Sequence, residues 1–163
     1  MNKIWVKTIF LLSRSFDYLI RAKEKRIDTL ADFHYQCTYF YDAERIFREA
    51  TEIIRTRSGL ILLKRDFAEI MKAMPKKYKT VLELKIHKKQ YFWKIAQELG
   101  CSLRNSIYIY NKALEHMRSA FVLKGYTDEK LVKVFGGDVF ISGLYLSAKE
   151  KEESFNAAAC GLL

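Results

Sequence analysis

Glycine and proline, the residues that most often interrupt regular structure, are scarce in this chain. Residues 1–58 contain neither, and all 163 residues together hold seven glycines and one proline. A β-sandwich needs many tight turns, whereas long helices joined by short connections need few. Half of the residues are hydrophobic and 29% are charged, which is typical of a globular chain. The sequence therefore predicts an all-α fold.

Apolar residues in the first third of the chain recur at helical spacing. One stripe consists of Ile20, Ile27, Leu30, His34 and Cys37, and a second consists of Ala43, Ile46, Ala50 and Ile53, widened by Phe47 and Ile54. We predict two long helices packed as an antiparallel hairpin, which form an N-terminal arm over residues 1–58. The competing arrangement is a continuous coiled coil that makes a homodimer through these N-terminal helices.

The remaining helix boundaries are predicted from glycine and proline. Ser58-Gly59 is expected to end the second helix, because glycine is common just beyond a helix C-terminus. A third helix then buries Leu62, Leu63, Phe67, Ile70, Met71 and Met74. Pro75 breaks it and opens a further helix that runs to about His87. Residues 59–125 form the second domain. Residues 126–163 form a C-terminal extension with a short helix before Gly136-Gly137. Its last eight residues, 156–163, are expected to be poorly ordered.

The segment Phe92–Arg118 has the pattern of a helix-turn-helix. Four residues, Phe92, Ile95, Ala96 and Leu99, share one helical face, and Gly100 ends that helix. Ser102 is suited to cap a second helix over about 102–118, with Ile109, Ala113, Leu114 and Met117 facing inward. A short helix, a turn with glycine and a capped second helix form the unit that many proteins insert into the DNA major groove.

Positive charge is concentrated around this unit. The net charge of the chain is +10, and residues 75–125 contain eleven lysines and arginines against three acids. Such a surplus favours polyanions through counterion release.

We predict DNA base contacts from the start of the second helix, at Leu103, Arg104, Asn105 and Tyr108. Phosphate contacts are predicted from Lys76, Lys77, Lys88, Lys89, Lys94, Ser102 and Lys112, and His87 is placed in the same basic loop. Four aromatic residues are expected to flank the groove: Tyr91, Trp93, Tyr108 and Tyr110.

The stretch MPKKYKTVLELKIHKKQYFWKIAQELGCSLRNSIYIYNKALEHMR resembles the fourth conserved region of bacterial RNA polymerase sigma factors. That region typically has a leucine-proline pair, an apolar helix, the motif IAxxLGxS and an ending similar to RALxxLR. Matching residues here include Pro75, Ile95, Ala96, Leu99, Gly100, Ser102, Ala113, Leu114 and Arg118. The resemblance implies promoter recognition, with the second helix in the major groove of the −35 element and contacts from Leu103, Arg104, Asn105, Tyr108 and Lys112.

Three residues depart from that family's pattern, and one of its regions is missing. Leu103 and Tyr108 stand where Arg, Lys or Gln is commoner, and Ser106 replaces a buried Val or Ile. Residues 1–70 show no counterpart of the sigma region that melts DNA. The chain therefore resembles the regulators of Firmicutes and their phages that have region four alone. Two alternatives are a helical adaptor that docks on RNA polymerase without reading DNA, and a phage packaging or late-gene factor.

The sequence offers no pattern for an enzyme, a metal site or another cofactor. The three cysteines, Cys37, Cys101 and Cys160, lie far apart. We expect reduced thiols and a cytoplasmic location. The apolar run near the N-terminus is interrupted by Lys7 and Arg14, and it is too short to span a bilayer. No membrane partner is expected.

Overall fold

The computed structural model describes residues 1–36 and 43–160, with side chains described for 1–32 and 43–153. These residues form helices and no strand, so the predicted all-α class is confirmed. The described side chains exclude two predicted stripe residues, His34 and Cys37, and all of residues 156–163, which the sequence predicts to be poorly ordered. No helix of the described part has the length and apolar character required to cross a membrane.

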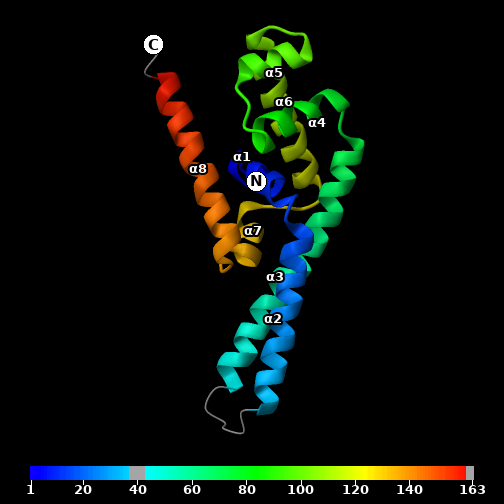
Figure 1. Cartoon of the computed structure of the whole chain (residues 1–163), viewed down its shortest axis with the longest axis vertical. Helices are drawn as coiled ribbons and strands as arrows, with labels where there is room; N and C mark the ends of the chain where they lie inside the picture. Colours follow the sequence, from blue (N-terminus) through cyan, green and yellow to red (C-terminus); the bar gives the residue numbers. More distant parts are fainter. Residues whose placement is uncertain (37–42, 161–163) are drawn as a thin grey trace.

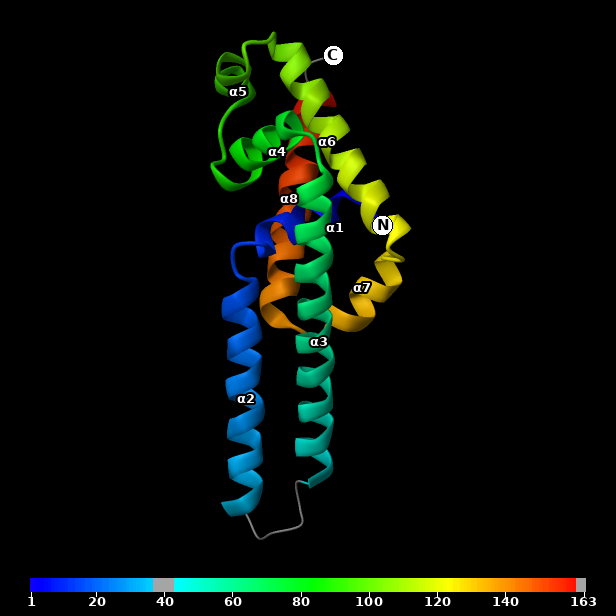
Figure 2. The same ribbon diagram turned by 90° about the vertical axis from the view of Figure 1, so that its right-hand side faces the viewer.

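Helices α2 (Phe16–Gln36) and α3 (Ala43–Ala73) lie side by side and run in opposite directions (Figure 1; Figure 2). Three ion pairs link them along their length: Arg26 with Glu49 at 2.7 Å, Arg57 with Glu24 at 2.5 Å, and Lys64 with Asp17 at 2.5 Å. Exposed pairs of this kind contribute little individually. The three ion pairs lie at intervals along α2 and α3, in the order expected for two antiparallel helices.

The predicted helix end at Ser58-Gly59 is wrong, because α3 continues through both residues to Ala73. Gly59 instead allows a close approach of α7 (Asp128–Phe135). A Cβ atom at position 59 would collide with Cγ1 of Val134. The unbroken helix also fixes which side chains face inward. Leu60 and Leu63 are fully buried, whereas Leu62, predicted to be inward, is exposed.

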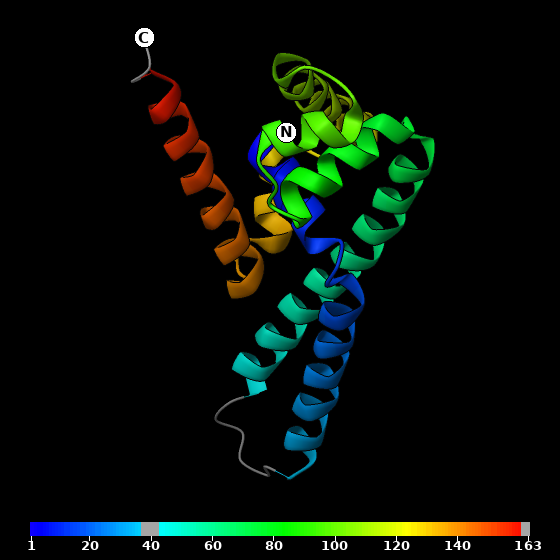
Figure 3. The same ribbon diagram turned by 45° about the horizontal axis from the view of Figure 1, so that its top comes forward.

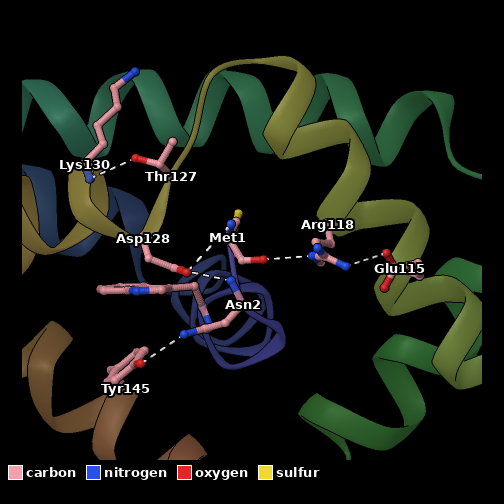
Figure 4. A network of polar contacts seen from close by, with 9 residues as sticks. Met1, Asn2, Glu115, Arg118, Thr127, Asp128, Lys130 and Tyr145 are labelled. Carbon is pink, nitrogen blue, oxygen red and sulfur yellow. Dashed lines mark hydrogen bonds and ion pairs between the residues drawn. The ribbon is translucent and has the colours of Figure 1, made fainter.

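The apolar N-terminal run forms α1 (Lys3–Leu12), and its buried side chains include Trp5, Val6, Ile9 and Phe10. This helix packs against α6 (Leu103–Leu123) and α8 (Val139–Cys160). Polar contacts at its start fix its position (Figure 4). Asn2 caps α1 through Trp5 N, and its side-chain amide donates to the Tyr145 hydroxyl of α8 at 3.2 Å. The Asn2 backbone N–H donates to Asp128 at 2.9 Å. The apolar face of α1 is therefore part of the core.

A buried carboxylate joins α3 to the end of α6. Asp66 accepts a hydrogen bond from the Tyr126 hydroxyl at 2.8 Å and lies 3.3 Å from Lys124 Nζ. Burial raises the pKa of Asp66, but hydrogen bonds from Tyr126, Lys124 and Arg65 outweigh it, so this pKa lies below its usual value. Burial, and secondarily the Asp66 carboxylate, raises the pKa of the Tyr126 hydroxyl.

The remaining helices form the upper part of the molecule (Figure 3). Helix α4 (Lys76–Leu82) continues into a π-helical turn, η2 (Glu83–His87), which together cover the predicted helix that ends near His87. Helix α5 (Phe92–Leu99) precedes α6. The segment from Asp138 to Leu146 lies in α8 apart from its first residue, and Asp138 caps this helix through Ile141 N at 3.0 Å.

Candidate nucleic-acid interface

The turn between α5 and α6 is built as the sequence predicts. Gly100 has a φ of 61°, in the left-handed region that favours glycine. The Cys101 N–H donates to the Ala96 carbonyl and the Gly100 N–H to the Gln97 carbonyl, a pattern that satisfies the last carbonyls of α5. Ser102 then caps α6, since its hydroxyl oxygen accepts a hydrogen bond from the Asn105 N–H at 3.2 Å.

The two helices pack closely at a small set of buried residues. Ile95 and Ala96 of α5 are buried, as are Ser106 and Ile109 of α6. The Ser106 hydroxyl lies 2.7 Å from the Leu103 carbonyl oxygen and 3.3 Å from that of Phe92. This side chain is therefore small enough for a tight crossing and also provides a polar contact between the two helices. The serine that departs from the family pattern has a structural role here.

All four predicted base-contacting residues lie exposed in the first two turns of α6. Arg104 and Tyr108 are four residues apart and share one face of the helix, while Asn105 lies beside them. The side chains of Arg104 and Asn105 form no hydrogen bond or ion pair with another described residue. Tyr108 contacts Lys112, whose ammonium lies 5.6 Å from the ring centroid. This face is free to bind an external ligand.

The predicted phosphate-contacting residues are also exposed, but they come from four separate elements. Lys88 and Lys89 follow η2, Lys94 lies in the first turn of α5, and Lys112 lies in α6 one turn beyond Tyr108. Lys89 has a φ of 53°, an uncommon conformation for a lysine. No ion pair with another described residue occupies these four ammonium groups. Ser102 is also exposed, at the N-terminus of α6.

Lys76 and Lys77 lie further from the base-contacting face. They open α4 next to Tyr78, whose ring packs against His116 at a centroid distance of 5.8 Å. His116 is eight residues beyond Tyr108, which corresponds to roughly 12 Å along an α-helix. These two lysines therefore lie beside the C-terminal half of α6. The structure does not bring them to its N-terminal half.

His87, which the sequence places in the basic loop, does not belong to the exposed basic surface. Its side chain is only 6% exposed. One ring nitrogen lies 2.7 Å from a Glu83 carboxylate oxygen and the other 2.8 Å from the Phe10 carbonyl oxygen. Glu83 also pairs with Arg14 at 2.5 Å. Burial raises the pKa of Glu83, but the His87 and Arg14 contacts outweigh it and hold this pKa below its usual value. His87 thus links η2 to α1.

The aromatic residues expected to flank the groove divide into two groups. Tyr91, Trp93 and Tyr108 are more than half exposed. Tyr110 is buried, and its ring packs edge-on against Phe92 at 5.4 Å. Burial, and secondarily the charge of Glu152, raises the pKa of the Tyr110 hydroxyl. Three exposed aromatic rings therefore remain on or next to the α5–α6 unit.

The α5–α6 unit presents hydrogen-bonding side chains, free ammonium groups and exposed rings, which together suit a polyanion that carries flat bases. No group of three or more possible metal-ligating side chains occurs among the described residues. Comparisons with protein-family models, curated proteins and solved structures give no match to this chain.

Proposed function

We propose that this chain is a sequence-specific DNA-binding transcription regulator that resembles sigma factor region 4 and places α6 in the major groove. The observation that carries the proposal is the exposed, uncommitted face formed by Arg104, Asn105 and Tyr108 at the start of α6. This face follows a glycine turn and a serine cap, and it lies in the most basic third of the chain.

These side chains match the hydrogen-bonding groups on base edges. An arginine guanidinium pairs with O6 and N7 of guanine, and an asparagine amide pairs with N6 and N7 of adenine. Leu103, which is half exposed, offers an apolar contact to a thymine methyl group. The first turns of a recognition helix are the part that normally reaches the bases. Arg104 and Asn105 are therefore the residues proposed to give sequence preference.

The lysines supply affinity that does not depend on sequence. Two of them, Lys94 and Lys112, lie in the α5–α6 unit, and Lys88 and Lys89 lie just before it. None of the four carries a competing ion pair among the described residues. Each phosphate contact releases condensed counterions, so affinity falls as salt rises. The Ser102 hydroxyl accepts from Asn105 N and keeps its own proton available for a phosphate oxygen. Lys76 and Lys77 are proposed to contact phosphates further along the duplex.

Selection of genomic DNA fragments by the purified chain, followed by footprinting, tests the proposal. We expect enrichment of a short common sequence and protection of one major-groove face, with affinity that decreases steeply with salt. Failure to detect any duplex binding at low salt would eliminate this function. Equal binding to all fragments would support the phosphate contacts but exclude the proposed recognition of bases.

A second candidate is an adaptor that docks on RNA polymerase without reading DNA. It is favoured by three apolar side chains on α3, at Phe47, Ile54 and Ile61, which are spaced by seven residues and at least 40% exposed. A coiled-coil partner or a second copy of the chain would cover such a line. If polymerase co-purifies with the chain despite Arg104→Ala and Asn105→Ala, and Ile54→Glu abolishes this, the adaptor role is supported. Sedimentation of the unchanged protein and of the Ile54→Glu variant, each without polymerase, tests for the homodimer.

A further inference from the structure

A hollow of about 370 Å³ is lined in part by Phe92 and Tyr110, whose rings pack against each other. Five elements line it: α1, η2 with its following loop, α5, α6 and α8. Most of its wall is apolar and is formed by Leu11, Ile86, Phe92, Ile107, Leu114 and Ala148. This volume falls within the range of roughly 300–1,000 Å³ that is usual for small-molecule sites.

The charged residues of this hollow are strongly biased toward cations. Four lysines line it, Lys7, Lys85, Lys89 and Lys151, against one acid, Glu152. Lys7 pairs with Glu152, which links α1 to α8. The other three lysines have no ion-pair partner among the described residues: Lys85, Lys89 and Lys151. An apolar cavity that retains three uncompensated cations is complementary to an anion with an apolar body.

Lys85 is the most constrained of these cations. Its ammonium lies 4.3 Å from the Phe92 ring centroid and donates to the Gln90 carbonyl oxygen at 3.2 Å. Burial, and secondarily the nearby charge of Lys7, lowers the pKa of Lys85 below its usual value. A negative group placed between Lys7 and Lys85 would relieve the repulsion between the two ammonium groups. Asn111 and Tyr110 supply polar atoms in the same wall.

We propose that this hollow binds a small amphipathic anion, an aliphatic chain with one carboxylate or phosphate head group. The head group pairs with Lys85 and its neighbouring lysines, and the chain lies against Leu11, Ile107 and Leu114. The polar part of such a ligand fixes its orientation while the apolar wall provides most of the buried surface. This site lies outside the residues proposed to read DNA bases, and it shares one residue, Lys89, with the proposed phosphate contacts.

Titration calorimetry of the full chain with decanoate, below the concentration at which micelles form, tests the site. We expect one molecule bound per chain, and at least tenfold weaker binding of 1-decanol, which lacks the charge. Decyl phosphate in place of decanoate shows which head group fits better. Equal affinity for decanol and decanoate, or no binding of either anion, would overturn the proposal.

Two lysines of α8 provide matched variants. Lys151 lines the hollow, whereas Lys149 pairs with Glu153 at 3.8 Å and does not. We expect Lys151→Gln to weaken decanoate binding at least threefold and Lys149→Gln to leave it within twofold. Ala148→Phe, which fills the hollow, should abolish binding while circular dichroism shows an intact fold. If Lys149→Gln weakened binding as much as Lys151→Gln, or if Ala148→Phe bound decanoate normally, the ligand would lie elsewhere and the assignment would be wrong.

Discussion

The Ser106 hydroxyl oxygen of α6 lies 3.3 Å from the carbonyl oxygen of Phe92, the first residue of α5. Ser106 is fully buried, so this contact and the nearer one to Leu103 at 2.7 Å are shielded from water. A valine or isoleucine of the family pattern would occupy more space at the same crossing. The orientation of α6 relative to α5 therefore depends on a small polar side chain.

Replacing Ser106 tests this dependence. We expect Ser106→Ala to lower the free energy of unfolding by about 1 kcal/mol, because the variant lacks the buried hydroxyl that donates to a backbone carbonyl. Ser106→Val adds methyl groups to a closed site and should cost roughly 1–3 kcal/mol. Chemical denaturation gives both values, and Ser119→Ala, an exposed change on the same helix, is the control. A stabilising Ser106→Val would show that the crossing has room for a branched side chain.

Two helical glycines should respond to alanine in opposite directions. At Gly59 the added Cβ meets Val134 and the Phe135 ring, so Gly59→Ala is expected to destabilise the protein by roughly 1–3 kcal/mol. At Gly143 in α8 nothing lies within 4 Å, so Gly143→Ala should stabilise it by about 0.5–1 kcal/mol. Thermal and chemical denaturation measure both. Stabilisation by Gly59→Ala would contradict the packing of α7 on α3.

The link between Asp66 and Tyr126 predicts a specific dependence of stability on pH. Because the pKa of Asp66 lies below its usual value in the folded protein, its ionised form stabilises the fold at neutral pH. This contribution is complete above the unfolded-state pKa and is lost as pH falls through the lower native pKa. Tyr126→Phe removes one hydrogen bond to the carboxylate and should cost about 1–2 kcal/mol at pH 7.

Unfolding free energies measured at pH 7 and at steps down to pH 3 check this dependence. The decline of stability toward acid should be shallower in Tyr126→Phe than in the unchanged protein, because the variant has less stabilisation of the carboxylate to lose. Tyr91→Phe, at an exposed tyrosine, should follow the unchanged protein. Parallel curves for all three proteins would exclude a contribution from this hydrogen bond.

Arginine and lysine on the proposed DNA surface should have separable effects. We expect Arg104→Ala to reduce discrimination between the selected site and a mismatched site by about 1–3 kcal/mol. Lys88→Ala should weaken binding to both sites equally. It should also make the slope of log affinity against log salt concentration shallower, by about the amount expected for one phosphate contact. Fluorescence anisotropy over a range of salt concentrations measures both quantities. Equal losses of discrimination in the two variants would contradict the assigned roles.

Several features of α5 and α6 could be predicted from sequence because the residues that cause them are neighbours. A glycine in the left-handed conformation ends α5, and a serine three residues before Asn105 caps α6. The exposure of Arg104, Asn105 and Tyr108 follows from the period of the helix once Ile109 and Ala113 face inward. The all-α class follows similarly from the scarcity of turn residues.

Other features depend on residues that are distant in the chain. Gly59 has the local signature of a helix end, but α7 packs against it from positions some 75 residues later. His87 lies in a basic stretch, yet its burial depends on the Phe10 carbonyl, 77 positions earlier. The hollow with its lysines requires α1 and α8 to meet beside α6. Local sequence thus determined where α5 ends and α6 begins, and where α6 is exposed. Only the tertiary structure decided which glycines, histidines and lysines are enclosed, because burial depends on the segments that pack around them.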